Sequence, residues 1–229
     1  MSGEQLLYNR PTFPAQLNMA HPLARGLVGC WLLNEEGGLR AFDSSPYGNH
    51  GLVTGALSHY DGRTFDGVDD VIVVPDAASL QITGDITAIV WLKPTADADA
   101  TNRRFLSKIG ASTYAGEIEL YRTATSGVVS MARGNPAGST ESTMTGVAAL
   151  ATNTWVQVAA TSLGTTWSLY LNSVLDKTDT ITQTVAAGLN LGIGARAAGN
   201  VPIPAIIGEV FLYNRALTPQ EVQRNYLAT

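Results

Sequence analysis

The sequence predicts an all-β protein: a two-sheet antiparallel sandwich with a short C-terminal helix. Short segments rich in Val, Ile, Thr and aromatic residues recur from Arg25 onward, and Gly, Asn, Asp and Pro separate them. The segment 86–92 is apolar on both faces at its centre, as in a strand within a sandwich layer. With 229 residues, 45% of them hydrophobic and 14% charged, the chain is long enough for one such domain with a sizeable core.

The strands are assigned in chain order from the apolar segments and the turn residues that bound them. A turn holding Asp66, Gly67, Asp69 and Asp70 leads into the apolar segment that starts at Val71. Later strands are expected at 86–92 (ended by Pro94), 103–109, 115–121, 128–132, 155–161, 167–171, 189–194 and 206–213, with loops at 95–102 and 134–142. Asn172-Ser173 is expected to form the tight turn between two strands.

One helix is expected, at the end of the chain. Thr218 suits the N-cap, Pro219 the first helical position, and Glu221 closes a capping box. Val222 and Tyr226 are four residues apart and therefore share a face. The helix is predicted to pack against the sandwich.

Residues 1–24 differ from the rest of the chain and are assigned as an N-terminal arm, with the sandwich at 25–229. Pro11, Pro14 and Pro22 break any regular pattern and favour an extended segment. Its apolar residues could anchor an assembly interface; the candidates are Leu6, Leu7, Tyr8 and Phe13. A disordered tail is the alternative interpretation.

Charge and cysteine content exclude several classes. The net charge of −5 argues against a nucleic-acid partner. No segment approaches the roughly 20 apolar residues of a membrane helix, so membrane insertion is not expected. The first five residues, MSGEQ, lack the features of a signal peptide, and the single Cys30, expected to be buried, cannot form an internal disulfide. Both features favour synthesis in a reducing cytoplasm.

Several segments, taken together and in order, resemble a known family. They are 26–38 (GLVGCWLLNEEGG), 43–51 (Asp43 followed by SSPYGNHG), 64–75 (TFDGVDDVIVVP), 89–94 (IVWLKP), 155–161 (WVQVAAT), 169–175 (LYLNSVL) and 213–217 (YNRAL). This set is similar to the laminin-G-like, concanavalin A-like jelly-roll domains, of the kind found in phage structural proteins, and the similarity covers about 25–229. It implies a jelly-roll sandwich closed by a terminal helix.

The same resemblance implies a structural Ca²⁺ ion. Its ligands would be Asp43, Asn49, Asp66 and Asp70, oxygen donors of the kind that Ca²⁺ prefers. Alternatively, each Asp caps its own turn through a side-chain bond to the backbone. Many relatives carry an acidic pair where this chain has Gly208 before Glu209, which removes one possible ligand.

Catalysis is not expected. Glycosidases on this scaffold need paired carboxylates on one strand face, and the best match is Glu117 and Glu119. Arg122 replaces the third acid, and a solvated strand face explains the pair. The histidines, His21, His50 and His59, form no metal-spaced cluster. Three tryptophans, Trp31, Trp91 and Trp155, are expected in the core and Trp167 is left open, while Tyr47, Tyr60 and Tyr114 are candidates for a contact surface.

These observations predict a protein that works by binding and assembly. The favoured function is a non-enzymatic structural or decoration protein of a tailed-phage particle, because residues 22–31 resemble the start of such domains. It would be made in the host cytoplasm and carried on the virion. Its partners would be itself, as a trimer or other homo-oligomer, other virion proteins and host surface glycans. The alternative is a free-standing carbohydrate-binding, lectin-like module, located in a bacterial cytoplasm or reaching the cell surface without a signal peptide.

Overall fold

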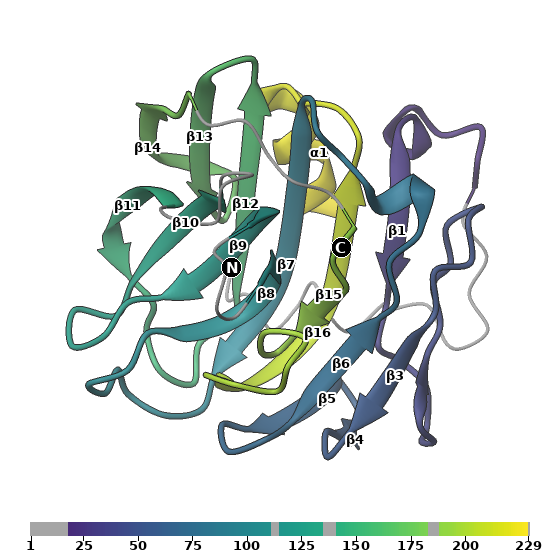
Figure 1. The fold of residues 1–229 in the computed structure, drawn as a ribbon, viewed down its shortest axis with the longest axis vertical. Helices are drawn as coiled ribbons and strands as arrows, with labels where there is room; N and C mark the ends of the chain where they lie inside the picture. Colours follow the sequence, from purple (N-terminus) through teal and green to yellow (C-terminus); the bar gives the residue numbers. More distant parts are fainter. Residues whose placement is uncertain (1–17, 111–114, 135–140, 183–187, 229) are drawn as a thin grey trace.

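The computed structural model describes residues 18–110, 115–134, 141–182 and 188–228, and these fold into two antiparallel sheets packed face to face (Figure 1). The first sheet has the order β14 (Val174–Thr180), β13 (Thr166–Leu171), β12 (Val156–Leu163), β7 (Ile86–Pro94), β16 (Pro204–Tyr213), β5 (Gly62–Asp66), β4 (Leu57–His59), and β1 (Leu27–Trp31) also pairs with β16. The second has the order β11 (Glu141–Ala149), β10 (Val128–Gly134), β9 (Gly116–Arg122), β8 (Arg103–Ile109), β15 (Leu191–Ile193), β6 (Val71–Val74), β3 (Gly51–Thr54), β2 (Arg40–Ala41). The predicted fold class is therefore confirmed.

The strands differ from the sequence assignment mainly at the sheet edges. Five short or polar strands were not predicted: β2, β3, β4, β5 and β11, whereas β14 follows the predicted turn at Asn172-Ser173. Gly134 ends β10 and Glu141 begins β11, so both ends of the predicted loop 134–142 are strand, while 135–140 lie outside the described residues. Edge strands bury one face at most, which leaves them without the apolar pattern that marks central strands.

The inter-sheet core follows from alternation along each strand. In β7, Ala88, Val90 and Leu92 point inward, and Ile118 and Leu120 of β9 face them from the other sheet. The fully buried large aromatic residues of this core include Trp31, Trp167, Phe65 and Phe105. The position of Trp167, left open by the sequence, is thus in the core.

Trp91 and Trp155 are buried as predicted, but outside the inter-sheet core. They pack with Ile206 on the opposite face of the first sheet, beneath helix α1 (Pro219–Ala228). The rings of Trp91 and Tyr226 stack at 5.5 Å between centroids. A third apolar layer, between sheet and helix, therefore supplements the sandwich core and includes the buried Cys30 and Val222.

The arm predicted for residues 1–24 is described only from residue 18. Pro22–Ala24 form a single 3-10 turn in which Leu23 is buried, while Met19 is half exposed. The proposed anchors Leu6, Leu7, Tyr8 and Phe13 lie outside the described residues. Within the part of the chain that is described, no helix is long and apolar enough to cross a membrane.

Two buried or half-buried charged side chains tie the sheets together at the two sides of the sandwich. At one side, Arg63 of β5 donates to the carbonyl of Gly38, beside β2, at 3.2 Å. At the other, the Asp176 carboxylate of β14 accepts the backbone N–H groups of Val147 and Ala148 in β11, at 2.8 and 3.0 Å. The Asp176 bonds join the outermost strands of the two sheets, β14 and β11, and the Arg63 bond joins β5 to the segment before β2.

Candidate functional site

Asp43, a predicted metal ligand, is buried and fully engaged by the protein itself. Its Oδ1 accepts the N–H groups of Cys30 and Ser45, both at 2.8 Å. Its Oδ2 accepts the Asn49 N–H and the Ser45 hydroxyl, both at 2.7 Å. Four donors use the strong acceptor positions of both oxygens, so the carboxylate fastens the 43–49 loop to β1.

Asn49, the second predicted ligand, belongs to the same network. Its side-chain amide donates to the Val28 carbonyl at 2.9 Å and to Ser79 Oγ at 3.0 Å, and its backbone carbonyl accepts Trp31 Nε1–H at 2.9 Å. The structure thus brings Asp43 and Asn49 together, in an arrangement whose hydrogen bonds are internal.

Asp66 and Asp70 form a separate group with Asp69, and one carboxylate oxygen of each lies within 4.8 Å of the other two. Asp43 is not part of this group. Asp70 is buried and its Oδ2 accepts the Asp66 N–H at 2.8 Å, whereas Asp66 and Asp69 are exposed. Burial raises the pKa of Asp70, and the charges of Asp66 and Asp69 raise it further. A Cβ at Gly55 would collide with the Asp70 carboxylate.

Three convergent carboxylates fit a hard cation such as Ca²⁺, because the positive charge of the ion offsets the repulsion among the three negative groups. In such a site Asp66, Asp69 and Asp70 would be the ligands from this turn. Asp69 was not in the set implied by the family resemblance, although its position in the same turn could have indicated it.

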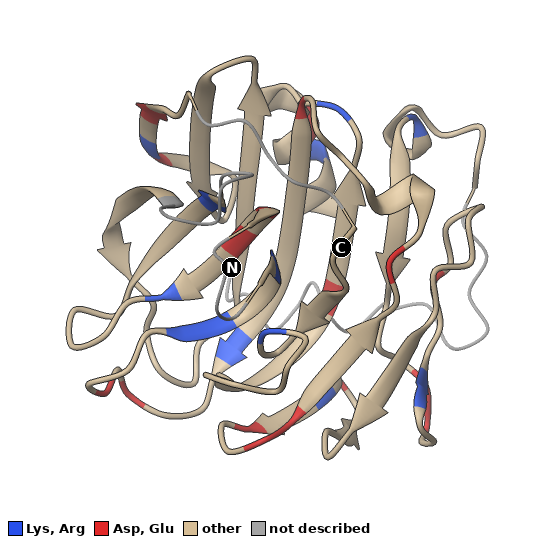
Figure 2. Cartoon of the chain, viewed as in Figure 1, with Lys and Arg blue, Asp and Glu red and all other residues tan. Residues whose placement is uncertain are grey.

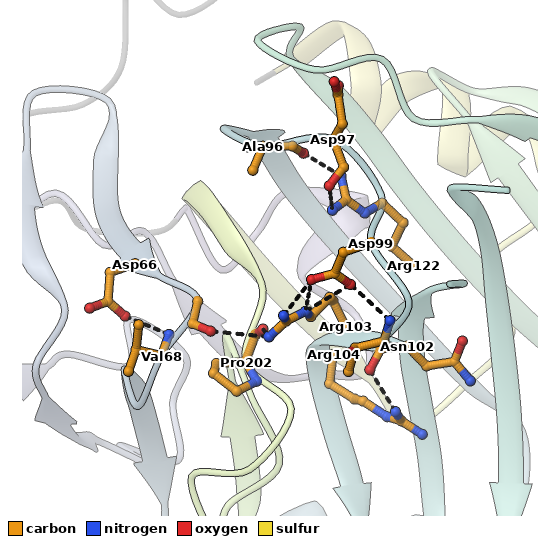
Figure 3. Close-up of polar contacts among 12 residues, drawn as sticks. Asp66, Val68, Ala96, Asp97, Asp99, Asn102, Arg103, Arg104, Arg122 and Pro202 are labelled. Atoms are coloured by element: carbon orange, nitrogen blue, oxygen red, sulfur yellow. Dashed lines mark hydrogen bonds and ion pairs between the residues drawn. The ribbon is translucent and has the colours of Figure 1, made fainter. Parts of the chain in front are cut away.

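Arginine side chains order the loops beside this acidic turn (Figure 3). Arg103 donates to the carbonyls of Gly67 and Pro202, at 3.1 and 3.2 Å, and forms an ion pair with Asp99. Arg122 donates to the carbonyls of Ala96 and Asp97, at 2.7 and 2.9 Å. The turn 66–70 and the loop 95–102 are therefore held in place by side chains of β8 and β9.

The interpretation of Glu117 and Glu119 as a solvated strand face is wrong: both side chains are fully buried. They point away from the inter-sheet core, and Figure 2 shows this acidic segment of β9 beside basic segments of the neighbouring strands. Glu119 accepts hydrogen bonds from Arg196 at 2.7 and 3.0 Å, from Arg104 at 3.0 Å and from Ser107 at 2.7 Å. Burial alone would raise its pKa, but the two guanidinium groups hold the pKa below its ordinary value.

Glu117 has a different environment. Lys108 Nζ donates to Glu117 Oε1 at 2.8 Å and to Asp76 Oδ1 at 2.9 Å. Within the described residues, Glu117 Oε2 is buried without a hydrogen-bond partner. Burial raises the pKa of Glu117 to about 7, in spite of the opposing effect of Lys108. Sequence reasoning missed this network, although the hairpin register, which pairs Ser107 with Glu119, places Arg104 and Lys108 close to the two acids.

A third feature, here called the hairpin patch, centres on the exposed Tyr60 at the turn between β4 and β5, with His59 and Asp61 of the same hairpin and Lys93 and the buried Trp155 from neighbouring segments. Tyr60 is 83% exposed, and its ring centroid lies 4.2 Å from that of His59. Lys93 Nζ lies 5.5 Å from the Trp155 ring centroid. Burial lowers the pKa of His59. The Asp61 carboxylate raises this pKa and the Lys93 ammonium group lowers it, so both charged groups lie near the imidazole ring.

Gly208 lies beneath this patch. A Cβ at this position would come within 3.1 Å of the Asp61 carbonyl and 3.4 Å of the Trp155 ring. Gly208 provides no side chain for a metal ion, and the same lack of a side chain allows the hairpin to lie close to β16. Of the other tyrosines proposed for contacts, Tyr47 is 55% exposed and Tyr114 lies outside the described residues.

The fold is similar to that of several solved structures. They include the binding domain of Paraclostridial Mosquitocidal Protein 1 (TM-score 0.71, 13% identity, covering 89% of this chain and 52% of that one). A second is the receptor binding domain of a botulinum neurotoxin C/D mosaic serotype (TM-score 0.71, 12% identity, 89% and 51%). A third is Trypanosoma rangeli sialidase in complex with sialic acid (TM-score 0.70, 16% identity, 89% and 33%).

This chain therefore spans about half the length of the two toxin domains and a third of the sialidase. At these identities the similarity concerns the fold. No curated protein matches the sequence significantly. Residues 66–223 match a laminin G family model described as the concanavalin A-like lectin/glucanases superfamily, and the chain belongs to this superfamily.

Proposed function

We propose that this protein is a non-enzymatic glycan-binding domain and that the hairpin patch is its sugar contact. The observation that carries the proposal is Tyr60, 83% exposed, with its ring tilted against that of His59 on a two-stranded hairpin. An exposed aromatic face offers apolar surface to the C–H face of a pyranose ring, and its own weak hydration favours such contact. Asp61 and Lys93 act electrostatically on His59 beside this ring, and polar groups of this kind can bond sugar hydroxyls.

The buried acids support a binding role over a hydrolytic one. A glycosidase needs an acid and a second carboxylate that both reach the scissile bond. Glu119 is fully buried and bonded to Arg104, Arg196 and Ser107. Glu117 is fully buried beside Lys108. Both carboxylates are used within the domain.

A glycan array followed by titration calorimetry on the best ligand tests the proposal. Tyr60→Ala is expected to abolish binding while leaving the circular dichroism spectrum and the melting temperature unchanged, because the side chain contributes little buried area. Tyr47→Ala, which removes another exposed tyrosine outside the patch, is the matched control. The proposal fails if no glycan binds, or if Tyr60→Ala binds as tightly as the parent protein.

We further propose that the domain is displayed on the particle of a tailed phage as a decoration protein that contacts host surface glycans. The order of the segments that resemble phage domains and the proline-rich segment 1–24 support this role. Leu23 is buried in the described domain, so the deletion that tests the arm should remove only residues 2–17. The shortened protein should fold but fail to join the particle. Mass spectrometry of purified particles should detect the full-length protein; its absence there would refute the role.

A further inference from the structure

Strand β14 ends the first sheet and offers a pairing edge. β13 pairs with one side of β14, and no other strand in the described ranges pairs with it. The two sheets are not equivalent at this side of the sandwich. In β11, the N–H groups of Val147 and Ala148 already donate to Asp176, whereas Thr178 and Asp179 of β14 are exposed.

The backbone groups that face outward from β14 can be assigned from the pairing with β13. Ile181 N–H donates to the Thr165 carbonyl at 2.9 Å, so residue 181 points its polar backbone groups toward β13. These groups alternate in direction along a strand. The N–H and C=O groups of Thr178 and Thr180 therefore point to the open side, where the Thr180 N–H donates to Asp179 Oδ1 at 2.8 Å, while those of Lys177 and Asp179 point toward β13.

The charges on β14 are complementary. Lys177 and Asp179 are two residues apart, so their side chains lie on the same face of the strand, opposite Leu169 and Trp167 of β13. Neither side chain forms an ion pair with any residue that the structure describes. The strand thus carries one positive and one negative side chain, side by side at an exposed edge.

We propose that two copies of this chain pair through β14, antiparallel about a two-fold axis at Thr178, to form one continuous sheet. Of the axes at Lys177, Thr178 and Asp179, the charges favour the one at Thr178. An axis at Lys177 would place two lysines opposite each other, and an axis at Asp179 would place two aspartates opposite each other, both unfavourable. With the axis at Thr178, Lys177 faces the partner's Asp179, and the reciprocal pair forms on the other side of the axis, as a two-fold interface requires.

The same register satisfies the backbone. Thr178 meets the partner's Thr178 as a hydrogen-bonded pair, because its N–H and C=O groups point outward. Lys177 and the partner's Asp179 form a non-hydrogen-bonded pair, in which opposing side chains come closest. Asp176, the extra residue of a bulge, is already engaged with β11 and adds no unpaired charge to the interface.

The dimer is independent of the glycan proposal, but it has a consequence for glycan binding. The hairpin patch lies at the β4 end of the first sheet and β14 lies at the other end. A dimer paired through β14 would carry two hairpin patches at the far ends of a continuous sheet. Two separated sites on one particle would bind a glycan-coated surface with higher avidity than either site alone.

Charge reversal tests the register directly, with the full chain and sedimentation velocity as the readout. The parent protein should dimerise, and Lys177→Glu or Asp179→Lys alone should each weaken the dimer about tenfold or more, because both cross-strand pairs become repulsive. A mixture of the two single variants should recover dimers that contain one copy of each. The double variant K177E/D179K should recover the dimer on its own.

Circular dichroism and melting curves establish that each variant is folded, and the mixing experiment is the control for any nonspecific effect of a substitution. The proposal is overturned if the parent protein is monomeric up to millimolar concentration or forms a trimer. It is also overturned if the single variants dimerise as well as the parent, or if their mixture remains monomeric.

Discussion

Thr218 and Glu221 cap the C-terminal helix through two reciprocal hydrogen bonds. The Thr218 N–H donates to the Glu221 carboxylate at 2.9 Å, and the Glu221 N–H donates to the Thr218 hydroxyl at 3.2 Å. Arg215 holds the same carboxylate with two nitrogens, each at 2.8 Å, and this pairing lowers the pKa of Glu221 to about 2. The capping box predicted from the sequence is confirmed, and the structure adds the arginine that fixes it to the end of β16.

Replacing the cap should destabilise the domain by a modest amount. Thr218→Ala removes the hydroxyl acceptor of the Glu221 N–H, and loss of an N-cap side chain typically costs about 1 kcal/mol of unfolding free energy. Denaturant unfolding measures the change. Gln223→Ala, an exposed change on the same helix, should leave the midpoint almost unaffected. Equal stability of Thr218→Ala and the parent protein would mean that Arg215 alone secures the helix.

The tryptophans beneath the helix should matter more. Trp91→Ala and Trp155→Ala each remove a buried indole between the first sheet and α1, and large-to-small changes of this kind cost roughly 3–5 kcal/mol. Because Trp91 stacks on Tyr226, Trp91→Ala should also loosen the helix. Hydrogen exchange of the helix amides would report this. The packing described above is wrong if both variants unfold at the parent's denaturant concentration, or if the exposed change Leu163→Ala has the same effect.

Features that depend on neighbouring residues could be read from the sequence. The cap follows from the three-residue spacing of Thr218 and Glu221. The tight turn at Asn172-Ser173 is also confirmed: both residues have positive φ, 49° and 64°, as a two-residue hairpin of this type needs. Local chemistry decides both structures, and no distant residue is required to complete them.

The environment of Glu117 and Glu119 could not be read in this way. The alternation of side chains along a strand correctly placed Glu117 and Glu119 on the face of β9 that points away from the core. The further inference that solvent covers this face was wrong. A cation that pairs with Glu119, Arg196, lies 77 residues away in sequence and reaches it only through the sheet order β9-β8-β15. The division of the predicted calcium ligands into two groups has the same cause, since strand order rather than sequence proximity separates Asp43 from Asp66.

Glu119 should be essential for folding stability. Glu119→Gln leaves two buried guanidinium groups without their counter-charge, and breaking a buried ion pair by removing one partner costs about 3–5 kcal/mol. Asp99→Asn is the matched control. It removes a carboxylate from an ion pair with Arg103 near the surface, and should change stability by at most about 1 kcal/mol. Similar losses for the two variants, measured by denaturant unfolding, would contradict this account.

Glu117 should make stability depend on pH in the opposite direction from an ordinary ion-paired acid. Its pKa is raised from 4.5 to about 7 in the folded protein, so the folded state binds more protons than the unfolded state between these values. The stabilisation is complete below about pH 4.5 and is lost as the pH rises to about 7. Glu117→Gln should therefore gain stability relative to the parent across this window, by up to about 3 kcal/mol. If the stability difference between the two proteins does not vary with pH, burial does not outweigh the ion pair with Lys108 at this carboxyl.

Calcium should act through the acidic turn and not through Asp43. If Asp66, Asp69 and Asp70 hold Ca²⁺, the ion binds only the folded protein and raises the melting temperature, and excess chelator reverses the rise. Asp69→Asn should abolish this response with little effect on the chelated protein, because Asp69 is exposed.

Asp43→Asn provides the comparison that separates the two groups of residues. It disrupts a four-donor network and should lower the melting temperature strongly, both with and without Ca²⁺, while the rise caused by the ion persists. If the parent melts at one temperature in Ca²⁺ and in chelator, and elemental analysis finds no metal, the turn 66–70 is a set of hydrogen-bonded caps. If Asp43→Asn instead abolishes the response to Ca²⁺, the ion lies at the 43–49 loop.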